Sequence, residues 1–112
     1  MFSFFKKKPM NYNDVDPIEF QRLIDEGGVI LDVRSPGELA EGSISGYKQI
    51  NFFEGTFRSK IEKLDKSKTY LVYCRSGNRS SQTCTMMDGM GFEKLYNLNG
   101  GIGAWNSSIS VI

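Results

Sequence analysis

Residues 74–80 bring several chemically capable groups into one short stretch of chain. They supply a thiol at Cys74, guanidinium groups at Arg75 and Arg79, and a glycine at position 77 that lets the backbone turn tightly. A thiol beside cationic groups and a helix N-terminus has its pKa lowered from about 8.5 towards roughly 3.5–7.5, so the nucleophilic thiolate forms near neutral pH. Loop N–H groups and arginine side chains also bind oxyanions. The stretch therefore predicts a cysteine nucleophile beside a place for an anionic substrate.

The composition excludes most other chemistry. The chain has no histidine and only two cysteines, Cys74 and Cys84. The lack of histidine rules out Ser-His-Asp and Cys-His pairs as well as imidazole metal sites, and two cysteines cannot build a four-thiolate zinc site. We therefore expect no metal and no cofactor. Two thiols without a sign of an oxidising compartment favour a cytoplasmic location.

Hydrophobic spacing and turn residues predict an alternation of strands and helices around this stretch. The expected order is a helix from Asp16 to Gly27, a strand at 29–33, a short helix at 35–39, a strand at 49–53, a helix at 56–64, a strand at 70–73, a helix at 80–90, a strand at 94–98, and a terminal helix containing Trp105. Such alternation is typical of an α/β fold: a small doubly wound, mostly parallel sheet with helices on both faces. Ligands bind at the carboxyl ends of its strands, where Cys74 would lie.

Length and charge limit the domain organisation and the partners. At 112 residues the chain is expected to form one domain over residues 10–112, preceded by a flexible tail at 1–9. Its 14 basic and 13 acidic residues give +1, and removal of Lys6, Lys7 and Lys8 leaves 11 against 13, or −2, which argues against nucleic-acid binding. The apolar residues 1–5 ahead of these lysines suggest either a weak interfacial anchor or a frayed tail. They are too few for a stable membrane anchor.

The loop also resembles the active-site loop of the rhodanese (thiosulfate sulfurtransferase) family. Two further blocks extend the resemblance: residues 31–38 with 41–42, and residues 91–92 with 99–105. The resemblance implies a rhodanese-like fold and a single-domain thiosulfate sulfurtransferase. Cys74 would then take sulfane sulfur from a small anionic donor, such as thiosulfate, as a persulfide. A thiophilic acceptor, such as cyanide, a thiol or a sulfur-carrier protein, would remove it.

Candidate site residues follow from the loop and from the resemblance. The expected nucleophile is Cys74, and the expected substrate-binding residues are Arg75, Ser76, Gly77, Asn78, Arg79 and Ser80. Asp32 and Arg34 could orient the loop or meet substrate, but are expected to support it as a structural ion pair or by capping backbone groups, with Glu38 as another possible partner for Arg34. Weaker candidates for the rim of the site are Phe53, Glu54, Phe57 and Arg58. Cys84 and Trp105 are expected to belong to the core.

Two other functions compete with sulfur transfer. Phosphatases and arsenate reductases of this fold have five residues between cysteine and arginine, which gives a wider cradle than the four residues between Cys74 and Arg79. A phosphatase also needs a placed general acid, and Asp32 is the only nearby acid in the motif. A non-catalytic binding module on the same scaffold is the other alternative, although catalytically inactive relatives commonly lack the loop cysteine.

Overall fold

A computed structural model describes residues 12–109 of the chain. The expected tail at residues 1–9 lies outside the described residues. In chain order the elements are β1 (Tyr12–Val15), α1 (Pro17–Asp25), β2 (Val29–Asp32), the 3₁₀ helix η1 (Pro36–Glu41), β3 (Lys48–Gln49), α2 (Phe57–Glu62), β4 (Thr69–Tyr73), α3 (Asn78–Gly89), β5 (Lys94–Leu98) and α4 (Gly101–Ile109).

The strands form one five-stranded sheet in the order β1-β5-β4-β2-β3, and every neighbouring pair is parallel. In the centre of the sheet Tyr70 of β4 lies opposite Val29 of β2 on one side and Leu95 of β5 on the other. Because all strands run the same way, their carboxyl ends meet at one edge. The sheet thus confirms the expected α/β class and places Cys74, directly after β4, at that edge.

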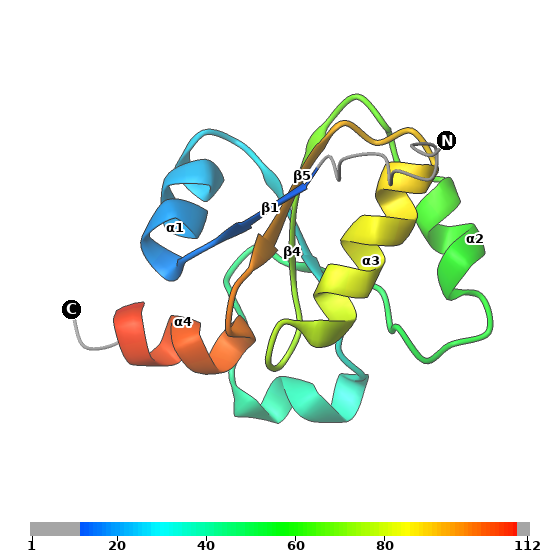
Figure 1. The fold of residues 1–112 in the computed structure, drawn as a ribbon. Helices are drawn as coiled ribbons and strands as arrows, with labels where there is room; N and C mark the ends of the chain where they lie inside the picture. Colours follow the sequence, from blue (N-terminus) through cyan, green and yellow to red (C-terminus); the bar gives the residue numbers. More distant parts are fainter. Residues whose placement is uncertain (1–11, 110–112) are drawn as a thin grey trace, which may run out of the picture.

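Helices cover both faces of the sheet, as Figure 1 shows. On one face α1 and α4 pack through a core cluster that includes Phe20, Leu23 and Ile102. On the other face α2 and α3 contribute Ile61 and Met87 to a second cluster. The central strands β2 and β4 lie between the two clusters, which explains their nearly continuous apolar sequences.

Local sequence signals account for the helix boundaries. The Asp16 side chain caps α1 by accepting a hydrogen bond from the Glu19 amide at 2.9 Å, and Pro17 occupies the first turn. The chain leaves that helix through Gly27, whose φ is +99°. Helix α3 begins at Asn78, two residues earlier than predicted, because Gly77 with φ +104° already serves as its N-cap. Asn78 and Arg79 therefore belong to the first turn of a helix.

Two strands differ from the sequence-based expectation. The edge strand β1 was not predicted, because its two central residues, Asn13 and Asp14, are polar and exposed and give no apolar pattern. The strand expected at 49–53 is shorter and lies earlier, at Lys48–Gln49. Beyond it the Asn51 side chain accepts a hydrogen bond from the Phe53 amide at 3.0 Å, which turns the chain away from the sheet.

Among the described residues, no helix has the length and apolar character needed to cross a membrane.

Candidate active site

The loop between β4 and α3 encloses the thiol of Cys74. Cys74 follows the last residue of β4 and is only 1% exposed, whereas Arg75, Ser76 and Asn78 are exposed. Gly77, between Ser76 and Asn78, has a positive φ, which reverses the chain so that α3 begins at the next residue. The loop thus forms a shell of backbone around one sulfur atom, with polar side chains on its outer side.

Three hydrogen bonds reach the sulfur. Its Sγ accepts from the Gly77 amide at 3.1 Å, from the Ser80 hydroxyl at 3.3 Å and from the Ser80 amide at 3.4 Å. Burial, the largest single influence, raises the pKa of the Cys74 thiol, but the Ser80 hydroxyl and the amides of Ser80, Gly77 and Ser76 lower it and together outweigh burial. The pKa therefore lies below that of an ordinary cysteine, which favours the thiolate.

The loop arginines act less directly than the sequence suggested. Arg79 forms a bidentate ion pair with Glu38, at 2.7 and 2.8 Å. This pairing is the main reason that the pKa of Arg79 is raised. The Arg75 side chain is 66% exposed and lies 3.7 Å from a Glu41 carboxylate oxygen. The sequence predicted that the helix N-terminus and the adjacent arginines lower the pKa of the thiol. The pKa is lowered, but by amides and a hydroxyl that contact the sulfur, while carboxylates partner the arginines.

A second turn, between β5 and α4, packs against the back of the loop. The Ile102 amide donates to the Cys74 carbonyl oxygen at 3.0 Å. A Cβ atom on Gly101 would lie 2.3 Å from the Arg75 carbonyl oxygen, and φ at that glycine is +63°. Only a residue without a side chain allows so close a backbone contact. Gly101 is therefore needed to hold the Cys74 loop in place.

A buried polar network supports the same edge of the sheet. Arg34 and Asp32, each with a fully buried side chain, form an ion pair at 2.7 Å, as expected. Burial, followed by Asp32, raises the pKa of the Tyr73 hydroxyl, which stays protonated and donates to Asp32 at 2.6 Å. Glu38 is also a partner of Arg34, through its backbone: Arg34 donates to the Glu38 carbonyl oxygen at 3.1 Å. The Glu38 carboxylate pairs instead with Arg79.

The residues considered for the rim have different positions. The Phe53 ring is 68% exposed and lies under the Arg79 guanidinium, 5.3 Å from it, so it does border the loop. Glu54 pairs with Lys60 at 2.8 Å. Phe57 is only 7% exposed and belongs to the core, so the suggestion that it lines the rim is wrong.

Comparison with known proteins agrees with this geometry. Residues 16–108 match the rhodanese-like domain family. The chain belongs to that family. It is 42% identical to the YtwF protein of Bacillus subtilis over 81 residues, which cover 72% of this chain and 76% of that protein. It is 37% identical to a sulfurtransferase of Allochromatium vinosum over 95 residues, covering 83% and 87%.

Solved structures show the same fold in the rhodanese-like family. A rhodanese-related protein from Thermoplasma volcanium superimposes with a TM-score of 0.77 at 30% identity, covering 88% of this chain and 94% of that one. The resemblance read from the three sequence blocks is thereby confirmed for the family and for the fold. Several of the similar proteins, including the one from Allochromatium vinosum, are named as sulfurtransferases. Membership in this family therefore supports a sulfurtransferase activity in general.

Sequence reasoning missed two residues beside this rhodanese-like loop. Asn97, on β5, is 3% exposed, and its side-chain amide contacts both Asp14 of β1 and the Gly77 carbonyl group. The sequence did offer one signal for Asn97: a polar residue between Tyr96 and Leu98 in the strand predicted at 94–98. Asp14 left no such signal, because its strand was not predicted.

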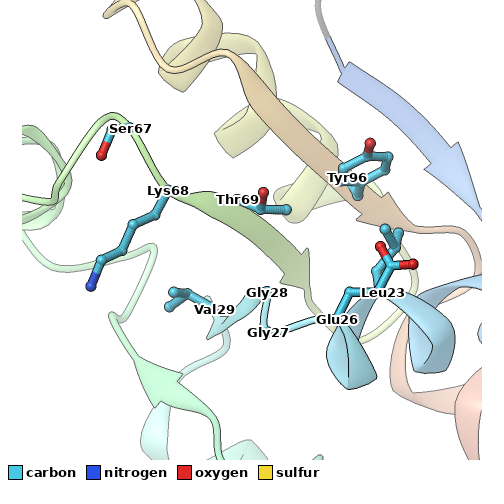
Figure 2. Close-up of a pocket in the computed structure, with 9 residues that line it drawn as sticks. All are labelled: Leu23, Glu26, Gly27, Gly28, Val29, Ser67, Lys68, Thr69 and Tyr96. Carbon is cyan, nitrogen blue, oxygen red and sulfur yellow. The ribbon is translucent and has the colours of Figure 1, made fainter.

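A separate hollow lies at the opposite edge of the sheet (Figure 2). It has a volume of about 430 Å³ and is lined by residues at the amino ends of β2 and β4, including Val29 and Thr69. Glu26 and Lys68 stand on opposite sides of it. Because Cys74 follows the carboxyl end of β4, this hollow is not part of the cysteine site.

Proposed function

We propose that the protein transfers sulfane sulfur through a persulfide on Cys74. The observation that carries the proposal is the set of three hydrogen bonds that converge on a buried Sγ from Gly77 and Ser80. Donors held this way stabilise negative charge on the Sγ thiolate, and we expect N–H groups of the same loop to stabilise the terminal sulfur of a persulfide, which lies one S–S bond beyond Sγ.

In the first half of the cycle the Cys74 thiolate attacks the outer sulfur of thiosulfate. The new bond joins Sγ to that sulfur, the sulfur–sulfur bond of thiosulfate breaks, and sulfite leaves with its electron pair. In the second half an acceptor nucleophile attacks the terminal sulfur, and Cys74 leaves as the thiolate. Each half conserves charge and needs neither an oxidant nor a proton donor. This suits a site whose nearest carboxylates are held by arginines.

The exposure of the loop supports a small anionic donor. Because Cys74 is 1% exposed, a donor has to reach it with a single protruding atom, as thiosulfate does with its outer sulfur. The side chains that such a donor meets first are the exposed Arg75, Ser76 and Asn78. Of these, Arg75 carries the positive charge that attracts an anion. A thiol or a sulfur-carrier protein would collect the terminal sulfur from the same side.

Intact mass spectrometry after incubation with thiosulfate tests the proposal. We expect the wild-type protein and Cys84→Ala to gain one sulfur atom and to lose it on addition of cyanide, while Cys74→Ser gains none. Absence of a gain in folded wild-type protein, with thiosulfate and with a persulfide donor, would contradict the proposal. Turnover of a phosphoester under those conditions would favour phosphoryl transfer, and a partner that binds Cys74→Ser as well as wild type would favour a binding module.

A further inference from the structure

Asn97 is a buried amide whose hydrogen bonds are unevenly satisfied. Its Nδ2 atom donates to the Asp14 carboxylate at 2.8 Å and lies 3.4 Å from the Gly77 carbonyl oxygen, which is long for an amide hydrogen bond. Its Oδ1 atom is buried and has no hydrogen-bond partner among the described residues. A buried polar atom left without a partner destabilises the folded state, so its presence requires a compensating contact.

The two acceptors determine which way the amide faces. A rotation by half a turn would place Oδ1 against the Asp14 carboxylate and the Gly77 carbonyl group, which have no proton to offer. The amino group therefore faces both acceptors, and Oδ1 is left inside the protein. The unsatisfied oxygen is the consequence of directing both N–H groups of one side chain at β1 and at the Cys74 loop.

Gly77 is the residue on which this contact acts. Its own N–H donates to the Cys74 Sγ at 3.1 Å, the shortest of the three hydrogen bonds to the sulfur. Its carbonyl oxygen already accepts from the Ser81 amide, in the first turn of α3, at 3.1 Å. Asn97 adds a second contact from the sheet, so Gly77 is held between α3 and β5 with its φ at +104°.

We infer that Asn97 is a positioning residue for the sulfur chemistry at Cys74: anchored by Asp14, it orients Gly77 so that the Gly77 amide donates to the sulfur. The inference rests on the proposed function, because it concerns the same cradle. The described hydrogen bonds of the Asn97 side chain go to Asp14 and Gly77 and not to the sulfur, so Asn97 acts through Gly77. The carboxylate of Asp14, a strong acceptor, fixes the amide and connects the edge strand β1 to the loop.

The pH profile of Cys74 alkylation measures this role. The charged and titratable groups around the thiol are Arg75 and Arg79 with their partners Glu41 and Glu38, the Asp32–Arg34–Tyr73 network beneath, Cys84 on α3 and Asp14 on β1. Only Asp14 is changed in the variants that follow. Loss of its negative charge would by itself lower the pKa of a nearby thiol, so an upward shift cannot come from that charge. Labelling with iodoacetamide, followed by peptide mass mapping, separates Cys74 from Cys84 and needs no sulfur donor.

The informative variants are Asn97→Leu, which keeps the size but removes the donor, and Asp14→Ala, which removes the anchor. We expect Asn97→Leu to raise the midpoint of the profile by about half a unit to one unit, which lowers labelling below the midpoint by about three- to tenfold. Asp14→Ala should give a smaller shift in the same direction. Two controls should keep the wild-type midpoint: Leu95→Val, on the same strand and buried like Asn97, and Asn13→Ala, exposed beside Asp14.

Wild-type midpoints in both Asn97→Leu and Asp14→Ala would overturn the inference and leave Asn97 with a role in stability alone. A shift in Asn97→Leu without one in Asp14→Ala would overturn the anchoring by Asp14 only. If Asn97→Leu does not fold, Asp14→Ala decides. Failure of the wild-type protein to gain sulfur would count against the proposed function and would leave this labelling comparison unaffected, so the two failures are distinguishable.

Discussion

The surroundings of Cys74 and of Cys84 differ sharply although both residues are almost fully buried. They are 1% and 0% exposed, lie ten positions apart, and belong to the same core cluster. The pKa of the Cys74 thiol is lowered, whereas burial, followed by the charges of Asp14 and Cys74, raises the pKa of the Cys84 thiol far above its usual range. The degree of burial therefore does not decide which of the two thiols has the lowered pKa.

The difference lies in the donors within reach of each sulfur. Burial raises the pKa at both sites, but at Cys74 the Ser80 hydroxyl and the amides of Gly77 and Ser80 reach the sulfur and outweigh it. Cys84 lies on the inner face of α3, where the backbone amides are occupied by helical hydrogen bonds. A loop that aims N–H groups inward can thus hold a thiolate in a place where a helix face keeps a thiol neutral.

The largest expected effect comes from disturbing the backbone contact behind Cys74. In Gly101→Ala the new methyl group would overlap the Arg75 carbonyl group, so the loop must move. We expect sulfur loading of Cys74 to fall at least tenfold and the free energy of unfolding to fall by about 2 kcal/mol or more. Mass spectrometry and urea unfolding measure the two effects.

Gly103→Ala is the matched control for that change. Gly103 lies in the same helix, is exposed, and has no described atom within 4 Å of the Cβ position. It should leave sulfur loading unchanged and should stabilise the protein by up to about 1 kcal/mol, because alanine favours the helix. Equal loading in the two variants would show that the turn after β5 does not hold the loop.

The next effect concerns Cys84 and the stability of the protein at alkaline pH. Because its pKa is raised in the folded state, its contribution is fully present below the unfolded pKa of about 8.5 and is lost as the pH rises beyond that value. Between pH 8 and pH 10 the Cys84 thiol should account for a loss of about 2 kcal/mol. Urea unfolding of Cys84→Ala, which lacks this ionisation, should show a correspondingly smaller loss. Parallel curves for the two proteins would contradict a raised pKa at Cys84.

A somewhat smaller effect is expected when one hydrogen-bond donor to the Cys74 sulfur is removed. Ser80→Ala deletes the hydroxyl group that lies 3.3 Å from the Cys74 Sγ, so the pKa of that thiol should rise by about one unit. Alkylation of Cys74 at a pH below the midpoint should slow by about tenfold. Ser81→Ala is the control, because its hydroxyl pairs with Tyr12 at 3.0 Å, and its rate should match wild type. A slower Ser81→Ala would point to a general disturbance of α3.

The smallest effect should follow from releasing a loop arginine. Arg79 is the main reason that the pKa of Glu38 lies at about 2. Burial raises this pKa, but hydrogen bonds from Ser35 also lower it, so the carboxylate is ionised at neutral pH. Glu38→Gln removes its charge and leaves the Arg79 guanidinium to favour the Cys74 thiolate. We expect the rate of Cys74 alkylation to rise by about twofold. Glu41→Gln, beside Arg75, should change it less. An acceleration above tenfold in Glu38→Gln would mean that charge, rather than the hydrogen-bond donors, distinguishes Cys74 from Cys84.

Some parts of the site could be predicted because their signals are local. Residues 74–80 are consecutive, and Asp32 and Arg34 are two positions apart, so each pattern was visible without knowledge of the fold. The ion pair of Glu38 with Arg79 was not visible, since these residues are separated by 41 positions and either could have had several partners. The contact of Asp14 with Asn97 spans 83 positions and depends on the unpredicted strand β1.

The amino-acid sequence alone determined the chemistry that is available: a cysteine between a buried strand and a glycine, arginines nearby, and no histidine to act as a base. It also determined the α/β alternation, because apolar spacing and capping residues act over a few positions. Only the tertiary structure decided which groups lower the pKa of the Cys74 thiol and what holds the loop. Those outcomes depend on the directions of N–H groups and on contacts between β1, β5, η1 and the loop, which form when distant segments meet at one edge of the sheet.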